Sequence, residues 1–341
     1  MLNFDKLTKY NSFIIDEIGV NHNGSVELAK KMIKSASECG VDAVKFQTFK
    51  SEDLVTENAK TANYQEENTS ENSQFEMLKK LELSFEDFKE LKKYASKHNV
   101  IFISSPFDIK SVNLLEKLNV SLYKLGSGEL NNFELIDHVQ KTDKPMIIST
   151  GMATLEEIKE TYDFIKNKNN LVILHCITGY PTSFEEANLN FIKTLQSEFD
   201  VPIGFSDHSP GIELPIAAVA LGACVVEKHF TLDKNLEGPD HKASLNPSEF
   251  KAMVDAIRNV EVAMGDGIRK FSENELEIKK VARKSIVLNQ DVSSGSIIEK
   301  EMLSIKRPGT GIAPKYIDEL VGKELNKDLK VNDVLKWEYF K

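Results

Sequence analysis

The sequence is poor in the features that mark secreted and membrane-spanning proteins. It has three cysteines in 341 residues, far apart in the chain, so neither a disulfide framework nor a zinc ribbon is indicated. Its longest apolar run, Pro215 to Val226, is too short to cross a bilayer, and its N-terminus does not have the pattern of a signal peptide. We therefore expect a soluble, cytoplasmic protein with reduced cysteines.

Positive charge is also scarce. The chain has 43 Lys and Arg residues against 53 Asp and Glu residues, a net charge of −10, without any block of basic residues. A surface that binds nucleic acid needs such a block to neutralise phosphates. The composition therefore predicts a small-molecule substrate, and no nucleic acid or membrane partner.

Short apolar runs alternate with helical patterns over most of the chain. The strand-like runs are Phe13–Ile18, Asp42–Phe46, Val100–Ser104, Ser121–Leu125, Pro145–Ser149, Leu171–Cys176, Pro202–Ser206 and Ala223–Val226. Eight β-α units fit a TIM barrel or an open doubly wound sheet, but no G-x-G-x-x-G fingerprint follows the first run. We predict the α/β fold of a (β/α)8 TIM barrel.

Two segments depart from this alternation. The polar segment Lys50–Asn72 is long for a barrel connection, and we predict either a substrate-covering loop or disorder. After Gly267 the chain becomes charged, and from Lys284 it has short β-branched pieces separated by turn residues. We divide the chain into a barrel (1–267), a linker (268–283) and a small β-rich domain (284–341).

Two histidines stand at matching points of the barrel. His208 and His229 follow the last two predicted strands, and neighbouring parallel strands lie about 4.8 Å apart. Barrel active sites form at this end of the strands. The two imidazoles can therefore share one divalent metal that acts as a Lewis acid, with the rest of its coordination left to water and substrate.

Other polar residues at the strand ends fall into two chemical groups. Cations and hydroxyls suit a phosphate and a carboxylate, and they are Lys45, Lys124, Ser127, Ser149 and Ser206. Acceptors suit a polyhydroxylated partner, and they are Glu17, Gln47, Glu129 and Asp240. The pattern predicts that an anionic phosphate substrate meets a sugar-like one beside the metal.

These residues lie in motifs that resemble those of the bacterial sialic acid synthases. The motifs are FIIDEIGVNHNG (13–24), VKFQT (44–48), ISSPF (103–107), YKLGSGE (123–129), ISTGM (148–152), GFSDHS (204–209), EKHFT (227–231), GPD (238–240), VARKS (281–285) and KRPG (306–309). The resemblance covers essentially the whole chain in order. It implies a TIM barrel followed by an antifreeze-like (SAF) domain.

The resemblance also implies a reaction. Synthases of this family, which make N-acetylneuraminate, legionaminate or pseudaminate, condense phosphoenolpyruvate with an open-chain N-acetylated amino sugar and water, releasing phosphate. We expect N-acetylmannosamine as the acceptor, with 2,4-diacetamido-2,4,6-trideoxymannose, the precursor of N,N′-diacetyllegionaminate, as the alternative. Gly179 stands where many members have a larger residue, which leaves the identity of the sugar open.

Roles carry over from the family to matching positions. Phosphoenolpyruvate is expected at Lys45, Ser105, Lys124, Ser127, Ser149 and Ser206, and the amino sugar at Glu17, Gln47, Tyr180, Asp240 and Arg307. His208 and His229 match ligands of a divalent ion, usually Mn²⁺, with Mg²⁺ or Co²⁺ as alternatives. For catalysis we name Glu129, Glu17 and Lys45, with Glu129 preferred to Glu17 as the base. Arg307 implies a domain-swapped homodimer.

Two other functions fit parts of the sequence. The 3-deoxy-sugar-phosphate synthases join phosphoenolpyruvate to a phosphorylated aldose in a similar barrel, but a sugar phosphate needs a second anion cluster, and the domain that carries Arg307 argues against them. Alternatively, the antifreeze-like domain is an ice-binding or interaction module. Lys306 and Arg307 suit a wet, ligand-facing surface better than the flat face that ice binding requires.

Overall fold

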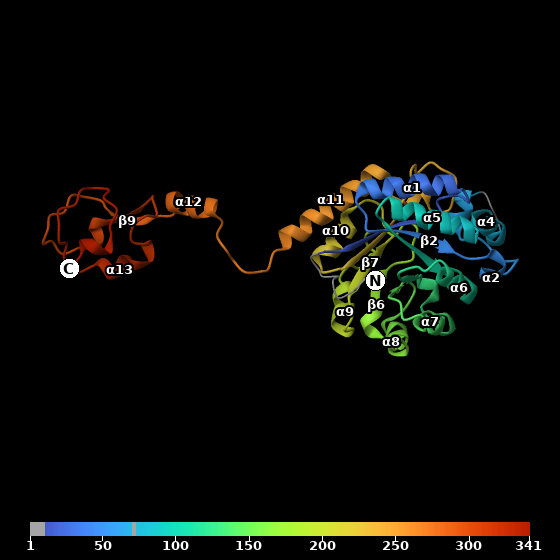
Figure 1. The fold of residues 1–341 in the computed structure, drawn as a ribbon. Helices are drawn as coiled ribbons and strands as arrows, with labels where there is room; N and C mark the ends of the chain where they lie inside the picture. The colour runs from blue at the N-terminus through green and yellow to red at the C-terminus, as the bar shows by residue number, and fades with distance from the viewer. Residues whose placement is uncertain (1–10, 70–72) are drawn as a thin grey trace. The chain divides into compact units, whose positions relative to one another are not determined.

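The computed structural model describes residues 11–69 and 73–341, and the chain divides into two compact units after Gly265 (Figure 1). The larger unit contains an eight-stranded parallel sheet with the strand order β3-β2-β1-β8-β7-β6-β5-β4. The end strands β3 and β4 are also in contact, which closes the sheet. The strands are β1 Phe13–Gly19, β2 Ala43–Thr48, β3 Ile101–Pro106, β4 Tyr123–Leu125, β5 Met146–Ser149, β6 Leu171–Cys176, β7 Ile203–Asp207 and β8 Val225–His229. The predicted TIM barrel is confirmed.

Helices follow the strands around the barrel (Figure 1). They are α1 Val26–Cys39, α5 Phe85–Lys97, α6 Ile109–Lys117, α7 Phe133–Gln140, α8 Leu155–Phe164, α9 Phe191–Glu198, α10 Glu213–Ala220 and α11 Pro247–Met264. Side-chain caps set where several begin, because the first backbone N–H groups of a helix lack partners within it. Ser84 and Asp87 form a capping box at α5, and Asn246 and Glu249 form another at α11.

The barrel core has two layers, and the period of two along each strand assigns residues to them. On β1, Phe13 and Ile15 point into the barrel, whereas Ile14 and Ile18 pack against the helices. Glu17 continues the inward series. Gly204 on β7 also faces inward, where an added Cβ would lie 2.5 Å from Leu174 and 2.6 Å from a backbone carbonyl oxygen, so only glycine fits.

The segment Lys50–Asn72 is partly helical, which corrects the prediction of a loop or disorder. It contains α2 Ser51–Leu54 and α3 Asn63–Thr69, and α4 Gln74–Leu81 follows. Residues 70–72 of the segment lie outside the described residues. Met77, Leu78 and Leu81 of α4 form a small apolar cluster with Val20 and Phe49, and this cluster anchors the segment beside the barrel mouth.

The smaller unit, Asp266–Lys341, begins with α12 Glu273–Ala282, which occupies most of the segment assigned as a linker. Beyond it, β9 Ser285–Leu288 pairs antiparallel with β10 Leu303–Lys306, and α13 Ile317–Leu320 follows. The unit has its own apolar core, which includes Ile286, Leu288, Ile298, Leu325 and Leu335.

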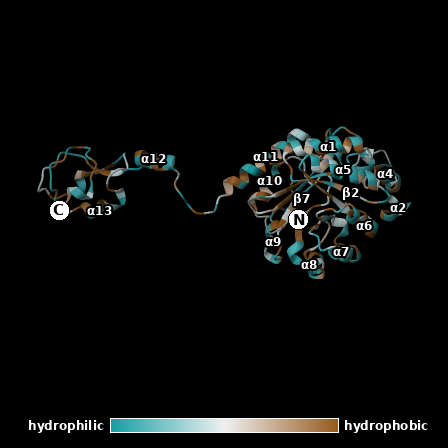
Figure 2. Ribbon diagram, in the orientation of Figure 1, coloured by the Kyte–Doolittle hydropathy of each residue, from teal (hydrophilic) through white to brown (hydrophobic). Residues whose placement is uncertain are grey.

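The surface helices carry a mixture of polar and apolar residues (Figure 2). Within residues 11–69 and 73–341, no helix is long and apolar enough to cross a membrane. Helix α10 is rich in apolar residues, and it buries part of its apolar surface by packing against α11.

Candidate active site

A cavity of about 240 Å³ lies at the C-terminal ends of the barrel strands, and every strand contributes to its lining. Inward-facing positions supply these residues, for example Lys45 and Gln47 on β2 and Glu227 and His229 on β8. The predicted residues that line the cavity are Glu17, Lys45, Gln47, Ser105, Lys124, Ser127, Ser149, Tyr180, Ser206, His208, His229 and Asp240. The barrel therefore brings together both predicted chemical groups.

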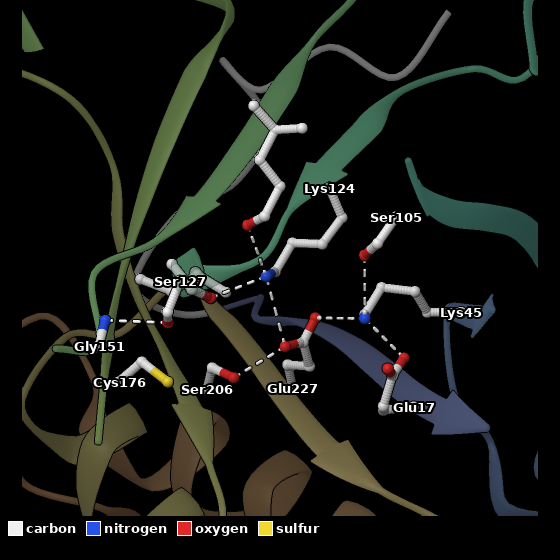
Figure 3. A network of polar contacts seen from close by, with 12 residues as sticks. Glu17, Lys45, Ser105, Lys124, Ser127, Gly151, Cys176, Ser206 and Glu227 are labelled. Carbon is white, nitrogen blue, oxygen red and sulfur yellow. Dashed lines mark hydrogen bonds and ion pairs between the residues drawn. The ribbon is translucent and has the colours of Figure 1, made fainter. Parts of the chain in front are cut away.

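Two buried lysines form one side of the cavity (Figure 3). Lys45 Nζ lies 2.6 Å from Glu17 Oε2 and donates to Ser105 Oγ at 3.3 Å. Lys124 Nζ donates to Ser149 Oγ at 2.7 Å. These are cations and hydroxyls at short range, which is the donor set that binds phosphate and carboxylate oxygens.

Glu227 lies between the two lysines and was given no role from the sequence (Figure 3). Its carboxylate oxygens are 3.6 Å from Lys45 Nζ and 3.6 Å from Lys124 Nζ, and Ser206 Oγ donates to it at 2.7 Å. A signal for it was available, because it stands two positions before His229 and therefore on the same face of the strand.

The two buried carboxyl groups respond differently to their surroundings. Burial alone would raise the pKa of Glu227, but Lys124 and Lys45 outweigh burial and hold it below its usual value. Burial raises the pKa of Glu17, Lys45 opposes the rise, and the negative charge of Glu227 adds to it. Glu227 therefore keeps its charge, and Glu17 is the group of the pair that takes up a proton.

The two histidines lie beside each other in the same cavity, at the ends of β7 and β8. Their ring centroids are 5.4 Å apart, and Tyr180 packs against both rings at 4.1 Å and 5.7 Å. His208 Nδ1 lies 2.8 Å from the Ile177 carbonyl oxygen, which can only accept, so Nδ1 donates and Nε2 keeps its lone pair. This tautomer suits a metal ligand.

In His229, the ring nitrogen without a hydrogen-bond partner in the described part of the chain is the buried Nδ1. Asp240 Oδ2 lies 3.9 Å from it. Burial, reinforced by His208, lowers the pKa of His229 well below its usual value, so the ring is neutral. Burial also raises the pKa of Asp240 to about 6.

A divalent ion fits this pair, with most of its ligands from elsewhere. No group of three or more His, Cys, Asp or Glu side chains in residues 11–69 and 73–341 surrounds one point, so the imidazoles would be shared with water or substrate. Burial alone would lower the pKa of His208, but Cys176 and the Ile177 carbonyl raise it overall. Where the pH is low enough for Nε2 to be protonated as well, ion binding must displace that second proton, which makes affinity depend on pH.

Two predicted residues are not among the described residues that line the cavity. Glu129, in the short 3₁₀ turn Ser127–Glu129, is not among the described residues that line the cavity, and its Oε2 accepts a hydrogen bond from Asn132 Nδ2 at 2.7 Å. Arg307 belongs to the smaller unit, where its exposed side chain donates from Nε to the Ala282 carbonyl at 3.1 Å.

Several lining residues were not predicted. Cys176 ends β6, with its Sγ 3.9 Å from His208 Nδ1, and Met152 stands at the mouth with 71% of its surface exposed. Gln65 from α3 also lines the cavity, so the segment assigned as a possible cover does reach it. Met152 and Gln65 come from connections whose path depends on tertiary packing.

Gly179 does not enlarge the cavity. The neighbouring Thr178 and Tyr180 line it, but Gly179 is not among the described lining residues. An added Cβ would meet Thr182, with Oγ1 at 3.3 Å and Cα at 3.5 Å. A side chain at this position would therefore start toward Thr182, which would have to shift by a few tenths of an ångström to accommodate it.

Comparison with known proteins gives matches to two family models. Residues 32–269 match the NeuB family and residues 283–341 the SAF domain. The chain is similar to N,N′-diacetyllegionaminic acid synthases of Legionella pneumophila (46% identity, 96% of this chain, 94% of the relative) and Campylobacter jejuni (45%, 95% and 99%). Its fold resembles a crystal structure of N-acetylneuraminic acid synthetase from Leptospira borgpetersenii in complex with citrate (TM-score 0.71, 34% identity, 79% of this chain, 90% of that chain).

Proposed function

The chain belongs to the NeuB family of sialic, legionaminic and pseudaminic acid synthases, and we propose that it is an N,N′-diacetyllegionaminate synthase. It would condense phosphoenolpyruvate with 2,4-diacetamido-2,4,6-trideoxymannose and water. The relatives named for this product are more similar in sequence than the Leptospira synthetase, which supports this acceptor over N-acetylmannosamine, our first expectation. N-acetylmannosamine is the second candidate, supported by the likeness to that synthetase.

The observation that carries the proposal is the pairing of two buried lysines with two buried histidines in one cavity. Lys45 and Lys124 would bind the phosphate and carboxylate of phosphoenolpyruvate, together with the hydroxyls of Ser105, Ser149 and Ser206. Before substrate binds, the negative charge of Glu227 offsets the positive charge of the two lysines. We assign it the role of holding both ammonium groups in position to face the anion.

The acceptor sugar would occupy the histidine side of the cavity. His208 and His229 would hold a divalent ion, Mn²⁺ by our expectation, with Mg²⁺ or Co²⁺ as alternatives. Bound there, the ion would supply Lewis-acid polarisation of the acceptor carbonyl. Gln47, Tyr180 and Asp240 would orient the sugar hydroxyls and amides, because they line the same cavity and carry hydrogen-bonding groups.

The chemistry forms one carbon–carbon bond and one carbon–oxygen bond and breaks one carbon–oxygen bond. C3 of phosphoenolpyruvate attacks the aldehyde carbon, whose oxygen takes up a proton and becomes a hydroxyl. Water adds at C2 and gives up a proton, and phosphate leaves with the oxygen that joined it to C2, so that C2 becomes a ketone. A carboxylate must take the proton of that water. We now assign this role to Glu17 rather than Glu129, because Glu17 lines the cavity and its raised pKa suits a group that gains and loses a proton near neutral pH.

We also propose that the enzyme acts as a domain-swapped homodimer. Arg307 of one subunit would reach the acceptor in the other subunit, where its guanidinium would add a fixed set of donors to the sugar side. The proposal rests on the match of the Lys306–Gly309 motif to the family and on the SAF domain at residues 283–341.

The test of the acceptor is a comparison of two sugars with purified protein, phosphoenolpyruvate and Mn²⁺. Phosphate release gives kcat/KM for 2,4-diacetamido-2,4,6-trideoxymannose and for N-acetylmannosamine. We expect a preference of about 100-fold or more for the first sugar, because unsatisfied polar groups penalise a wrong substrate strongly. Equal values, or preference for N-acetylmannosamine, would reject this acceptor and leave the reaction class intact.

A further inference from the structure

A buried ion pair lies on the opposite face of the strands from the two histidines. Lys228 stands between Glu227 and His229 on β8, and Asp207 stands between Ser206 and His208 at the end of β7. The Lys228 ammonium donates to Asp207 Oδ2 and to the Ser209 carbonyl oxygen. Both side chains are almost completely buried, with 0% and 1% of their surface exposed.

The pair joins the two strands where their regular pairing stops. Asp207 and Lys228 are the last residues of β7 and β8 that are in register with each other. His208 follows immediately, outside the strand, so regular pairing between these strands does not extend to its backbone. Lys228 instead contacts the residue before His208 and the residue after it, while Ser209 N donates to Asp207 Oδ1 at 2.9 Å.

Packing alone does not require charges here. One step earlier on the same outer face, Phe205 pairs with Val226, and both belong to the apolar layer between strands and helices. Two buried charges pay a large desolvation cost, and apolar residues of similar volume often replace such a pair without loss of stability. An apolar pair could not make the directional contacts that Lys228 makes with the residue before His208 and the residue after it.

We propose that the Asp207–Lys228 pair is a positioning element that sets the separation and orientation of the His208 and His229 imidazoles for metal binding. This inference rests on the proposed function, in which these histidines hold a divalent ion. Asp207 and Lys228 are not among the described residues that line the cavity. They act through the backbone of the histidines, in the way that outer-shell partners orient metal ligands in other sites.

The test measures binding of Mn²⁺ alone, by the electron paramagnetic resonance signal of the free ion, without substrate or turnover. The main variant is the double change Asp207→Asn with Lys228→Met, which removes both charges and so leaves no unpaired ion in the core. We expect it to fold, as judged by urea unfolding, and to bind Mn²⁺ about 10- to 100-fold more weakly than the unchanged protein. The visible spectrum of bound Co²⁺ should change as well.

The matched control is Arg258→Met. Arg258 pairs with Asp42 at 2.9 Å and donates to the Ser12 carbonyl at 2.8 Å, at the N-terminal end of the same barrel. The Arg258→Met variant should be less stable than the unchanged protein and should bind Mn²⁺ with unchanged affinity. Unchanged affinity in the double variant, or an equal loss in the control, would overturn the positioning role. Failure of the unchanged protein to bind Mn²⁺ would instead reject the metal site itself.

Discussion

Glu17 Oε2 lies 2.6 Å from Lys45 Nζ at the floor of the cavity, and both side chains are buried. Lys45 cannot fully neutralise this carboxylate, because it also faces Glu227 at 3.6 Å. Two carboxyl groups and two lysines thus share one small, buried volume. We expect a charged substrate to shift the protonation equilibria of these four groups, and Glu17, whose pKa is raised, to be the carboxyl group that responds.

Replacement of Glu17 tests its assignment as the base. Glu17→Gln should lower kcat by about 10²- to 10⁴-fold, which is the usual contribution of general acid–base catalysis. In the unchanged enzyme, activity should rise with pH through the raised pKa of Glu17, because the deprotonated form is the base. This acidic limb of the kcat profile should be absent from the variant.

Glu129→Gln is the matched control for Glu17. It changes a half-buried carboxyl group of similar size that is hydrogen-bonded to Asn132 and is not among the described residues of the cavity lining. Its kcat should stay close to that of the unchanged enzyme. A larger loss for Glu129→Gln than for Glu17→Gln would restore our original preference for Glu129.

Removal of metal tests the role of the histidine pair. Exhaustive chelation should abolish turnover, and Mn²⁺ should restore it in the unchanged enzyme. His208→Ala should lower turnover by about 100-fold or more, because loss of a metal ligand should cost more than a change in a residue that only supports a ligand. Added Mn²⁺ should not restore its turnover. His138→Ala, at a half-buried histidine that contacts Asn113, is the control and should behave like the unchanged enzyme. Full activity after chelation would contradict the metal requirement.

Mixing of two inactive variants tests whether Arg307 acts between subunits. Arg307→Ala and His208→Ala should each be inactive alone. If the arginine serves the other subunit, exchange of subunits at equal concentrations should restore about a quarter of the active sites, since half of the dimers are mixed and one of their two sites is intact. Absence of recovery, with exchange verified by tagged subunits, would place Arg307 in its own chain's site or outside catalysis.

Asp16 predicts a dependence of stability on pH. Its side chain is fully buried, neither oxygen has a partner within the described residues, and burial, with help from Glu17, raises its pKa well above the usual value. The folded state therefore keeps a proton that the unfolded chain releases above about pH 4. Stability should fall as pH rises from there toward the raised pKa of the folded state.

Asp16→Asn should remove this loss. Urea unfolding at pH 4 and pH 8 should show a gain at pH 8, by about 1.4 kcal/mol for each unit of raised pKa, and a smaller difference at pH 4. Asp137→Asn, at an exposed carboxylate paired with Lys141, should show no such gain. Equal effects of Asp16→Asn at both pH values would mean that Asp16 does not carry a proton in the folded protein.

The sequence by itself determined the barrel and most of the candidate site. Alternating strands and helices predict eight β-α units, and the period of two along a strand fixes which residues face inward once the strand is recognised. This is why Lys45, Lys124, His208 and His229 could be placed at one mouth from the sequence.

Only the tertiary structure decided how side chains share the space inside that mouth. Glu227 is a central residue because two lysines from other strands converge on it, and sequence spacing cannot show such convergence. Glu129 turns toward Asn132 because a short 3₁₀ turn follows β4, so the strand period no longer applies. Gly179 meets Thr182 rather than the cavity. Strand positions follow from local periodicity, whereas the direction of connection residues depends on packing between distant parts of the chain.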